Sequence, residues 1–100
     1  VTDQATPQLH TALASNYPNP FNPSTNISFS LANPGEVSIQ IFNQKGQLVK
    51  TLLNSSLPAG NHQLTWNGTD EQGAQVGSGV YFYRMKSGKY SSTRKMVMMK

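Results

Sequence analysis

Residues 79–100 read GVYFYRMKSGKYSSTRKMVMMK and predict two consecutive β-strands joined by a turn at residues 87–89. Side chains alternate between the two faces of a strand, so one face of the first strand should carry Tyr81, Tyr83 and Met85. The opposite face should carry Val80, Phe82 and Arg84. Apolar residues on both faces predict a strand in the middle of a sheet.

The second strand ends in Lys95-Met-Val-Met-Met-Lys100, where Met96 and Met98 share one face. Chain ends fray unless something holds them, so this apolar tail is either docked in a sheet or presented to a partner. Six of the eight Lys and Arg residues lie between Arg84 and Lys100, so the formal charge of +4 is concentrated here.

The composition favours a single all-β domain. One hundred residues suffice for one hydrophobic core but are too few for two. Only 12% of the residues are charged and 36% are hydrophobic, with β-branched and aromatic residues in short runs between polar turns.

Upstream of Gly79, residues 1–15 show neither helical nor strand periodicity, and we interpret them as a linker. Residues 16–24, NYPNPFNPS, form a proline segment in which three prolines exclude a helix interior. We expect Tyr17 and Phe21 to plug a sandwich edge. Alternation then predicts four strands and a short fifth candidate, at residues 25–31, 37–42, 47–53, 62–66 and 74–76.

With the final hairpin, this makes six or seven antiparallel strands and no helix. The predicted fold is an all-β, immunoglobulin-like antiparallel β-sandwich. Trp66, the one tryptophan of the chain, is expected in its core.

Few residues of the chain suit catalysis or metal binding. Asp70 and Glu71 are neighbours in a polar turn, where carboxylates serve local hydrogen bonding. His10 lies in the linker and His62 begins a strand, so the sequence contains neither a nucleophile triad nor a metal-ligand spacing. Cysteine is absent, which excludes disulfides and thiolate sites. We therefore expect no catalytic residue, no metal and no cofactor.

The basic C-terminal region is not expected to bind nucleic acid, because Tyr81 and Tyr83 alternate like core residues instead of forming a stacking platform. Lysines at strand edges commonly prevent association between sheets, which fits a monomer. No run approaches the ~20 apolar residues of a membrane helix, so no membrane insertion of its own is expected.

Six short sequence motifs follow one another along the chain: Asn16–Thr25, Gly46 with Leu48-Val49, Ala59-Gly60 with His62, Trp66-Asn-Gly68, Gly79-Val-Tyr81 and Lys95–Lys100. In this order they resemble the C-terminal sorting domains of proteins exported by the type IX (Por) secretion system. The same core resembles the immunoglobulin-like domain of the flagellar hook-capping protein. The match starts at Tyr17, so the chain divides into a linker at 1–15 and a domain at 16–100.

The resemblance implies a targeting role for the domain instead of an enzymatic activity. Family members direct a passenger protein across the bacterial outer membrane after export to the periplasm, and a surface sortase often removes them. The implied partners are type IX translocon components and that sortase, and the implied location is the periplasm in transit, then the cell surface or the medium. The recognition positions carried over are Pro18, Pro20, Gly79, Val80, Tyr81, Lys95, Met96, Val97 and Lys100.

The chain departs from the family pattern at Asn67, where the usual residue is Asp, and in the methionine content of its tail. A second function class stays open: an immunoglobulin-like accessory module of a secreted enzyme, which spaces domains or binds glycan. In that case the last strand is an ordinary edge strand, and further domains would follow residue 100.

Overall fold

The computed structural model describes residues 10–99, which form seven β-strands and no helix. The strands are β1 (Ala12–Leu13), β2 (Thr25–Leu31), β3 (Gly35–Asn43), β4 (Leu48–Leu57), β5 (Gly60–Trp66), β6 (Gly79–Ser87) and β7 (Tyr90–Met98).

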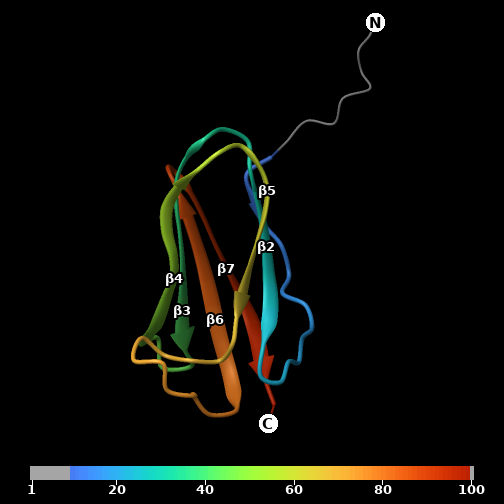
Figure 1. The fold of residues 1–100 in the computed structure, drawn as a ribbon, viewed down its shortest axis with the longest axis vertical. Helices are drawn as coiled ribbons and strands as arrows, with labels where there is room; N and C mark the ends of the chain where they lie inside the picture. The colour runs from blue at the N-terminus through green and yellow to red at the C-terminus, as the bar shows by residue number, and fades with distance from the viewer. Residues whose placement is uncertain (1–9, 100) are drawn as a thin grey trace, which may run out of the picture.

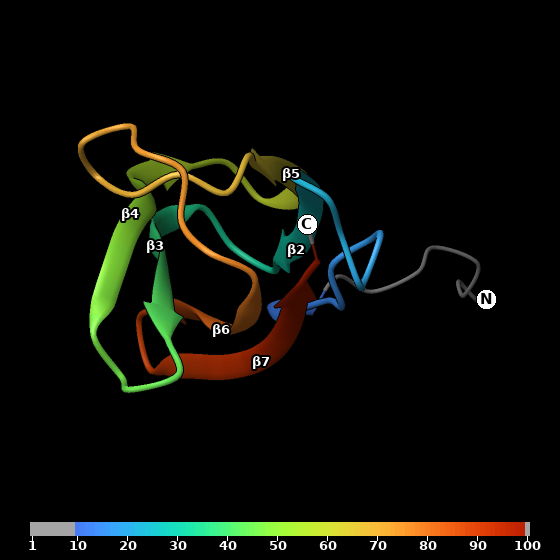
Figure 2. The same ribbon diagram turned by 90° about the horizontal axis from the view of Figure 1, so that it is seen from below.

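These strands form two sheets that face each other (Figure 1 and Figure 2). One sheet has three strands in the order β1-β2-β5, and the other has four in the order β4-β3-β6-β7. All strand pairs are antiparallel. The arrangement confirms the predicted immunoglobulin-like β-sandwich.

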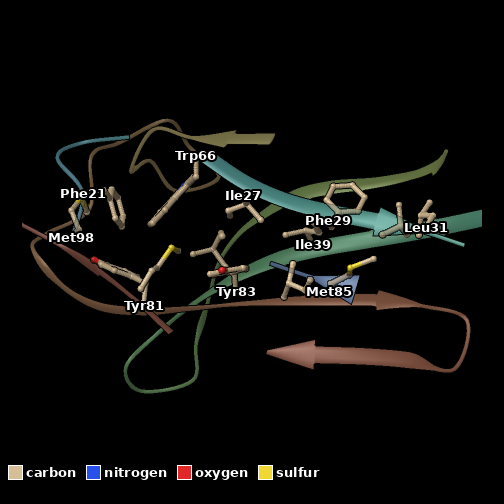
Figure 3. Packing of buried hydrophobic residues seen from close by; sticks show 14 residues of the cluster. Phe21, Ile27, Phe29, Leu31, Ile39, Trp66, Tyr81, Tyr83, Met85 and Met98 are labelled. Carbon is tan, nitrogen blue, oxygen red and sulfur yellow. The ribbon is translucent and has the colours of Figure 1, made fainter. Parts of the chain in front are cut away.

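The core lies between the sheets and follows the predicted alternation. In β2 every second residue, beginning with Thr25, is buried, because strand side chains alternate between the core and the outside. Figure 3 shows the buried side chains running along the sandwich, from Phe21 and Met98 at one end to Leu31 at the other. Trp66 is fully buried, which confirms its predicted place.

The final hairpin also folds as its sequence predicts. β6 lies between β3 and β7, and its inward residues Tyr81, Tyr83 and Met85 are buried. Met96 and Met98 of β7 join the same core. The apolar tail is therefore docked in the sheet.

The predicted linker extends too far along the chain, since its last part belongs to the sandwich. Residues 1–9 lie outside the described part of the chain. Ala12 and Leu13 form β1 and pair with Ser30 and Phe29 of β2. Leu13 is buried, and its backbone is held from β7: the Tyr90 hydroxyl accepts from its N–H (3.0 Å) and Arg94 Nε donates to its carbonyl (2.8 Å).

Two smaller expectations are wrong. Tyr17 is not a plug, because its side chain is 79% exposed, whereas the preceding Asn16 is buried. The short strand expected at residues 74–76 is reduced to one isolated bridge between Thr69 and Gln75. Phe21 is buried as predicted.

Candidate functional site

The proline segment, residues 16–24, crosses from one sheet to the other. Near its start, Tyr17 forms an antiparallel bridge with Asn26 of β2, with both N–H···O distances at 2.9 Å. Further on, Phe21 forms a parallel bridge with Met98 of β7. In Figure 1 this segment loops beside the end of β7. The segment thus joins the two sheets along one side of the sandwich.

Backbone groups at the end of β7 are taken up by this contact. Phe21 N–H donates to the Val97 carbonyl (3.0 Å), and Met99 N–H donates to the Phe21 carbonyl (2.9 Å). The side-chain oxygen Oδ1 of Asn19 accepts from Val97 N–H (3.0 Å). The segment therefore covers this part of the β7 edge. Because Pro20 and Pro23 have no N–H, the segment does not itself provide a regular edge for another strand to pair with.

A buried polar cluster fixes the start of the proline segment. Asn16, which is 4% exposed, donates from Nδ2 to Thr25 Oγ1 (3.0 Å) and to the Pro18 carbonyl (3.2 Å). The Thr25 hydroxyl donates to the same Pro18 carbonyl (2.8 Å). Buried polar groups need such partners, so these bonds favour a single path of the chain at Pro18.

Three aromatic rings meet behind the proline segment. The Phe21 and Trp66 ring centroids lie 5.7 Å apart, and those of Trp66 and Tyr81 lie 5.4 Å apart in an edge-to-face arrangement. Trp66 Nε1 donates to the Thr69 carbonyl (2.9 Å), and the Tyr81 hydroxyl donates to the Gly77 carbonyl (2.6 Å). Figure 3 shows Phe21, Trp66, Tyr81 and Met98 at the same end of the core.

Gly68 allows the chain to pass close to this cluster. Its φ of +75° is in the left-handed region that favours glycine. A Cβ at this position would lie 3.0 Å from the Pro23 carbonyl oxygen and 3.1 Å from Met98 Sδ. The Trp66-Asn-Gly68 motif therefore packs against the proline segment and β7.

Burial makes the two inward tyrosines of β6 harder to ionise. Desolvation raises the pKa of Tyr81 above 10.0. Burial also raises the pKa of Tyr83, and this effect outweighs the lowering by the Arg94 charge and by the backbone N–H of Asn16. The Tyr83 hydroxyl donates to the Ala14 carbonyl (2.7 Å), which links β6 to the residue that follows β1.

The structure brings most of the carried-over positions to this end of the sandwich. Gly79 and Val80 pair with Met98 and Val97 in the β6–β7 ladder, and the adjacent pair joins Tyr81 to Met96. Pro18 and Pro20 are exposed, as is Lys95.

Two of the carried-over positions do not reach the surface. Met96 and Tyr81 are buried, so their side chains serve the core and not the surface. Lys100 lies outside the described residues.

Three polar residues that hold this arrangement together were not predicted from the sequence: Asn16, Asn19 and Thr25. Each lies in or next to the proline segment, but its partners are set by the folded chain. For Asn19 the Asn-Pro pair was a visible signal, because an Asn in a turn commonly bonds to backbone groups. Asn16 and Thr25 carry no such signal.

Charged and imidazole groups outside this region serve local structure. Asp70 Oδ1 accepts from the backbone N–H groups of Gln72 and Ala74, both at 3.0 Å. Glu71 Oε2 accepts from Thr51 N–H (3.0 Å), and His62 Nε2 lies 2.8 Å from the Pro58 carbonyl oxygen. Over residues 10–99, no group of three His, Cys, Asp or Glu could hold a metal ion. Within that range, no helix is long and apolar enough to cross a membrane.

Several solved structures share this fold. Dimeric latent PorU from Porphyromonas gingivalis matches with 22% identity and a TM-score of 0.72, over 99% of this chain and 10% of that chain. PorZ, a surface component of the type IX secretion system of the same organism, matches with 23% identity and a TM-score of 0.60, over 86% of this chain and 11% of that chain. FlgD from Xanthomonas campestris matches with 24% identity and a TM-score of 0.59, over 75% of this chain and 55% of that chain.

At these identities the structures show a common fold and no more. The chain spans about a tenth of the length of PorU and PorZ. No curated protein matches it. The family model of the FlgD Ig-like domain, however, matches residues 15–91, which run from the end of the β1 region into β7. The chain therefore belongs to the FlgD Ig-like domain family.

Proposed function

We propose that this domain is a non-catalytic sorting domain that directs a passenger protein across the bacterial outer membrane by type IX secretion. Its partners are components of the type IX translocon, and its route leads through the periplasm to the cell surface or the medium. The supporting observation is the junction between the proline segment and β7, where Phe21 bridges Met98. Four of the six sequence motifs that carry the resemblance to sorting domains meet there: the proline segment, Trp66-Asn-Gly68, Gly79-Val-Tyr81 and the tail from Lys95.

The exposed parts of this junction suit recognition by another protein. Tyr17 is 79% exposed and Met99 is 56% exposed, although both are large apolar side chains. The backbone of Tyr17 is held by its bridge to Asn26, so the exposed ring extends from a fixed position. Exposed tyrosines on a rigid support are common anchors of protein interfaces.

The likeness to PorZ supports the same proposal at the level of the fold, since PorZ is a surface component of a type IX system. The bonds of Asp70, Glu71 and His62 to nearby backbone support a non-catalytic role, because these groups already have structural partners.

The direct test fuses residues 1–100 to the C-terminus of a periplasm-targeted fluorescent reporter in a bacterium with a type IX system. We expect fluorescence in the medium or on the cell surface, and periplasmic retention in an isogenic strain without the type IX channel. A reporter that stays intact in the periplasm of both strains would contradict the proposal and favour the accessory module.

A matched pair of variants separates recognition from folding. Tyr17→Ser should lower the secreted fraction without changing the melting temperature, because the ring makes little contact with the core. Leu48→Ser on β4 removes another exposed apolar side chain, 49% exposed and outside the junction, and should leave export unchanged. Equal export of both variants would remove Tyr17 from the recognition surface.

A further inference from the structure

β7 is the edge strand of the four-stranded sheet. Other parts of the described chain bond to its free edge only near its C-terminal end. The N–H and C=O of Val97 and the N–H of Met99 point away from β6, because they bond to Asn19 and Phe21. In an antiparallel strand the backbone groups of alternate residues point to the same side. The N–H and C=O groups of Ser91, Thr93 and Lys95 therefore also point outward.

No group within residues 10–99 pairs with these outward backbone groups. Ser91, Thr93 and Lys95 are also exposed. At ~3.4 Å per residue, residues 91–95 offer an open edge about 17 Å long. We call residues 91–95 the open edge.

The charges on the two strands next to the open edge, β6 and β7, are all positive. Thr93 is opposite Arg84 in the β6–β7 ladder, and Ser91 is opposite Lys86. Arg84 and Lys86 share the outer face of the sheet with Lys95, since the alternate residues of β6 are buried. β6 and β7 contain no Asp or Glu. The one carboxylate in the four strands of this sheet is Glu36 of β3, which lies at the end of the sheet near Lys86 and away from Lys95.

Arg84 carries a fixed positive charge on the same face of the sheet. Its guanidinium carbon lies 4.7 Å from the centroid of the Phe42 ring, and Nη2 donates to Gln40 Oε1 (3.3 Å). Its Nε is buried and has no hydrogen-bond partner among the described residues. Because Nε is buried and the side chain is directed towards β3, Arg84 offers a partner's carboxylate its positive charge and not this donor.

The other sheet edges of the sandwich are less suited to pairing with an added strand. The β4 edge has two register shifts against β3, and Glu71 already accepts from its Thr51 N–H. Bulges and side-chain contacts of this kind hinder strand addition. β5 carries no Lys, Arg, Asp or Glu, and the backbone of Leu13 in β1 is held by Tyr90 and Arg94.

We infer that the open edge of β7 binds an extended acidic segment of a partner protein, which adds a strand to the four-stranded sheet. The partner's main chain pairs with Ser91, Thr93 and Lys95, and its acidic side chains lie against Lys95 and Arg84. A second copy of β7 is disfavoured as the occupant, because pairing two β7 strands would bring together two sheet faces that each carry Arg84, Lys86 and Lys95. The inference rests on the proposed function only for the place of that partner in the translocon.

Binding is tested with the full chain and the fluorescent peptide Thr-Glu-Val-Glu-Val-Glu-Thr, compared with the same peptide carrying Lys in place of Glu. We expect binding of the acidic peptide alone. Two further acidic peptides carry N-methyl groups on alternate amides, one on the Glu set and one on the Val set. One of the two sets must face β7, so at least one peptide should bind about tenfold more weakly or not at all.

Two variants of Thr93 test the edge from the protein side. Thr93→Pro removes the outward N–H at a position where an edge strand tolerates proline, and should weaken binding by about tenfold or more. Thr93→Ala keeps the N–H and should bind like the parent. Amide NMR shifts should change at Ser91, Thr93 and Lys95. Melting curves of both variants show that the domain is folded.

The inference is overturned if the acidic peptide fails to bind, or if neither N-methylation nor Thr93→Pro weakens its binding, which would mean attraction by charge alone. The reporter fusion separates this failure from failure of the proposed function. Export of the parent and Thr93→Pro at equal levels would refute the open edge as the translocon contact and leave sorting intact. Periplasmic retention of the parent would refute sorting, while the peptide assay would still decide whether the edge binds.

Discussion

Phe21 and Met98 are partners in a parallel β-bridge, although one belongs to the proline segment and the other to the last strand. The bridge means that the chain covers the end of β7 with its own backbone. The tail from Lys95 onward was a candidate for pairing with a partner strand over its whole length. The structure restricts that possibility to the residues before Val97, because Asn19 and Phe21 occupy the groups that follow.

The tail should matter for folding as well as for recognition. Met98 is 1% exposed, so Met98→Ala should destabilise the domain by about 2–5 kcal/mol through lost contacts and a residual cavity. Met99→Ala, at the neighbouring exposed position, should change the free energy of unfolding by less than about 0.5 kcal/mol. Urea unfolding followed by tryptophan fluorescence compares the two. Equal stability of both variants would show that β7 contributes little to the core.

The core could be predicted from the sequence because its residues alternate over long strands. Ile27, Phe29 and Leu31 carry that signal within a single strand. β4 was predicted to end at Leu53 but continues to Leu57. The sequence did not show this extension because residues 54–56 are polar and exposed at a sheet edge, where no core imposes alternation. β1 has two residues, too few for any period, and is held by Tyr90 and Arg94 from the far end of the chain.

The candidate site could be predicted only in part, for a related reason. The motifs that contain Pro18 and Tyr81 could be recognised in the sequence. Their proximity in the structure depends on contacts between segments that are distant in the sequence. Asn19 illustrates the limit: its amide bonds to Val97 N–H, and nothing local distinguishes it from Asn22. Tyr17 was misplaced because Asn16, a polar residue, takes the inward position through its bonds to Thr25 and Pro18.

Gly68 should tolerate no side chain. Gly68→Ala places a Cβ 3.0 Å from the Pro23 carbonyl oxygen, at a φ of +75°, so both the backbone and its neighbour must shift. We expect a loss of more than about 1 kcal/mol, or a fall in melting temperature of more than about 4 °C. Gly35→Ala is the control, because a Cβ there meets nothing within 4 Å and no positive φ is required. An unchanged melting temperature for Gly68→Ala would contradict the close packing of this turn.

The domain should lose stability at alkaline pH through its buried phenols. Burial raises the pKa of Tyr81 and Tyr83 in the folded state, so folding favours the protonated form. This contribution is complete below the unfolded pKa of about 10 and is lost as the pH rises through the raised folded pKa. Melting temperatures measured from pH 8 upward should therefore fall beyond about pH 10.

Tyr83→Phe removes one of the two titrating groups and should make that fall less steep. The variant also loses the hydroxyl bond to the Ala14 carbonyl, so its melting temperature should be lower than that of the parent at pH 8. Parallel curves for the parent and Tyr83→Phe would show that the Tyr83 phenol does not contribute to the alkaline loss.

Removal of the domain by a surface protease should occur before residue 10. The predicted linker covers residues 1–15, but residues 12–14 are held against β2, with Ala14 N–H donating to the Ser28 carbonyl (2.9 Å). A protease needs an extended, accessible backbone, and cutting here would first require β1 to separate from the sheet. Mass spectrometry of the mature passenger's C-terminus should therefore place the cut within residues 1–9. A cut at Leu13 or Ala14 in the folded domain would show that β1 opens readily, and that the bonds from Tyr90 and Arg94 to Leu13 do not hold it in place.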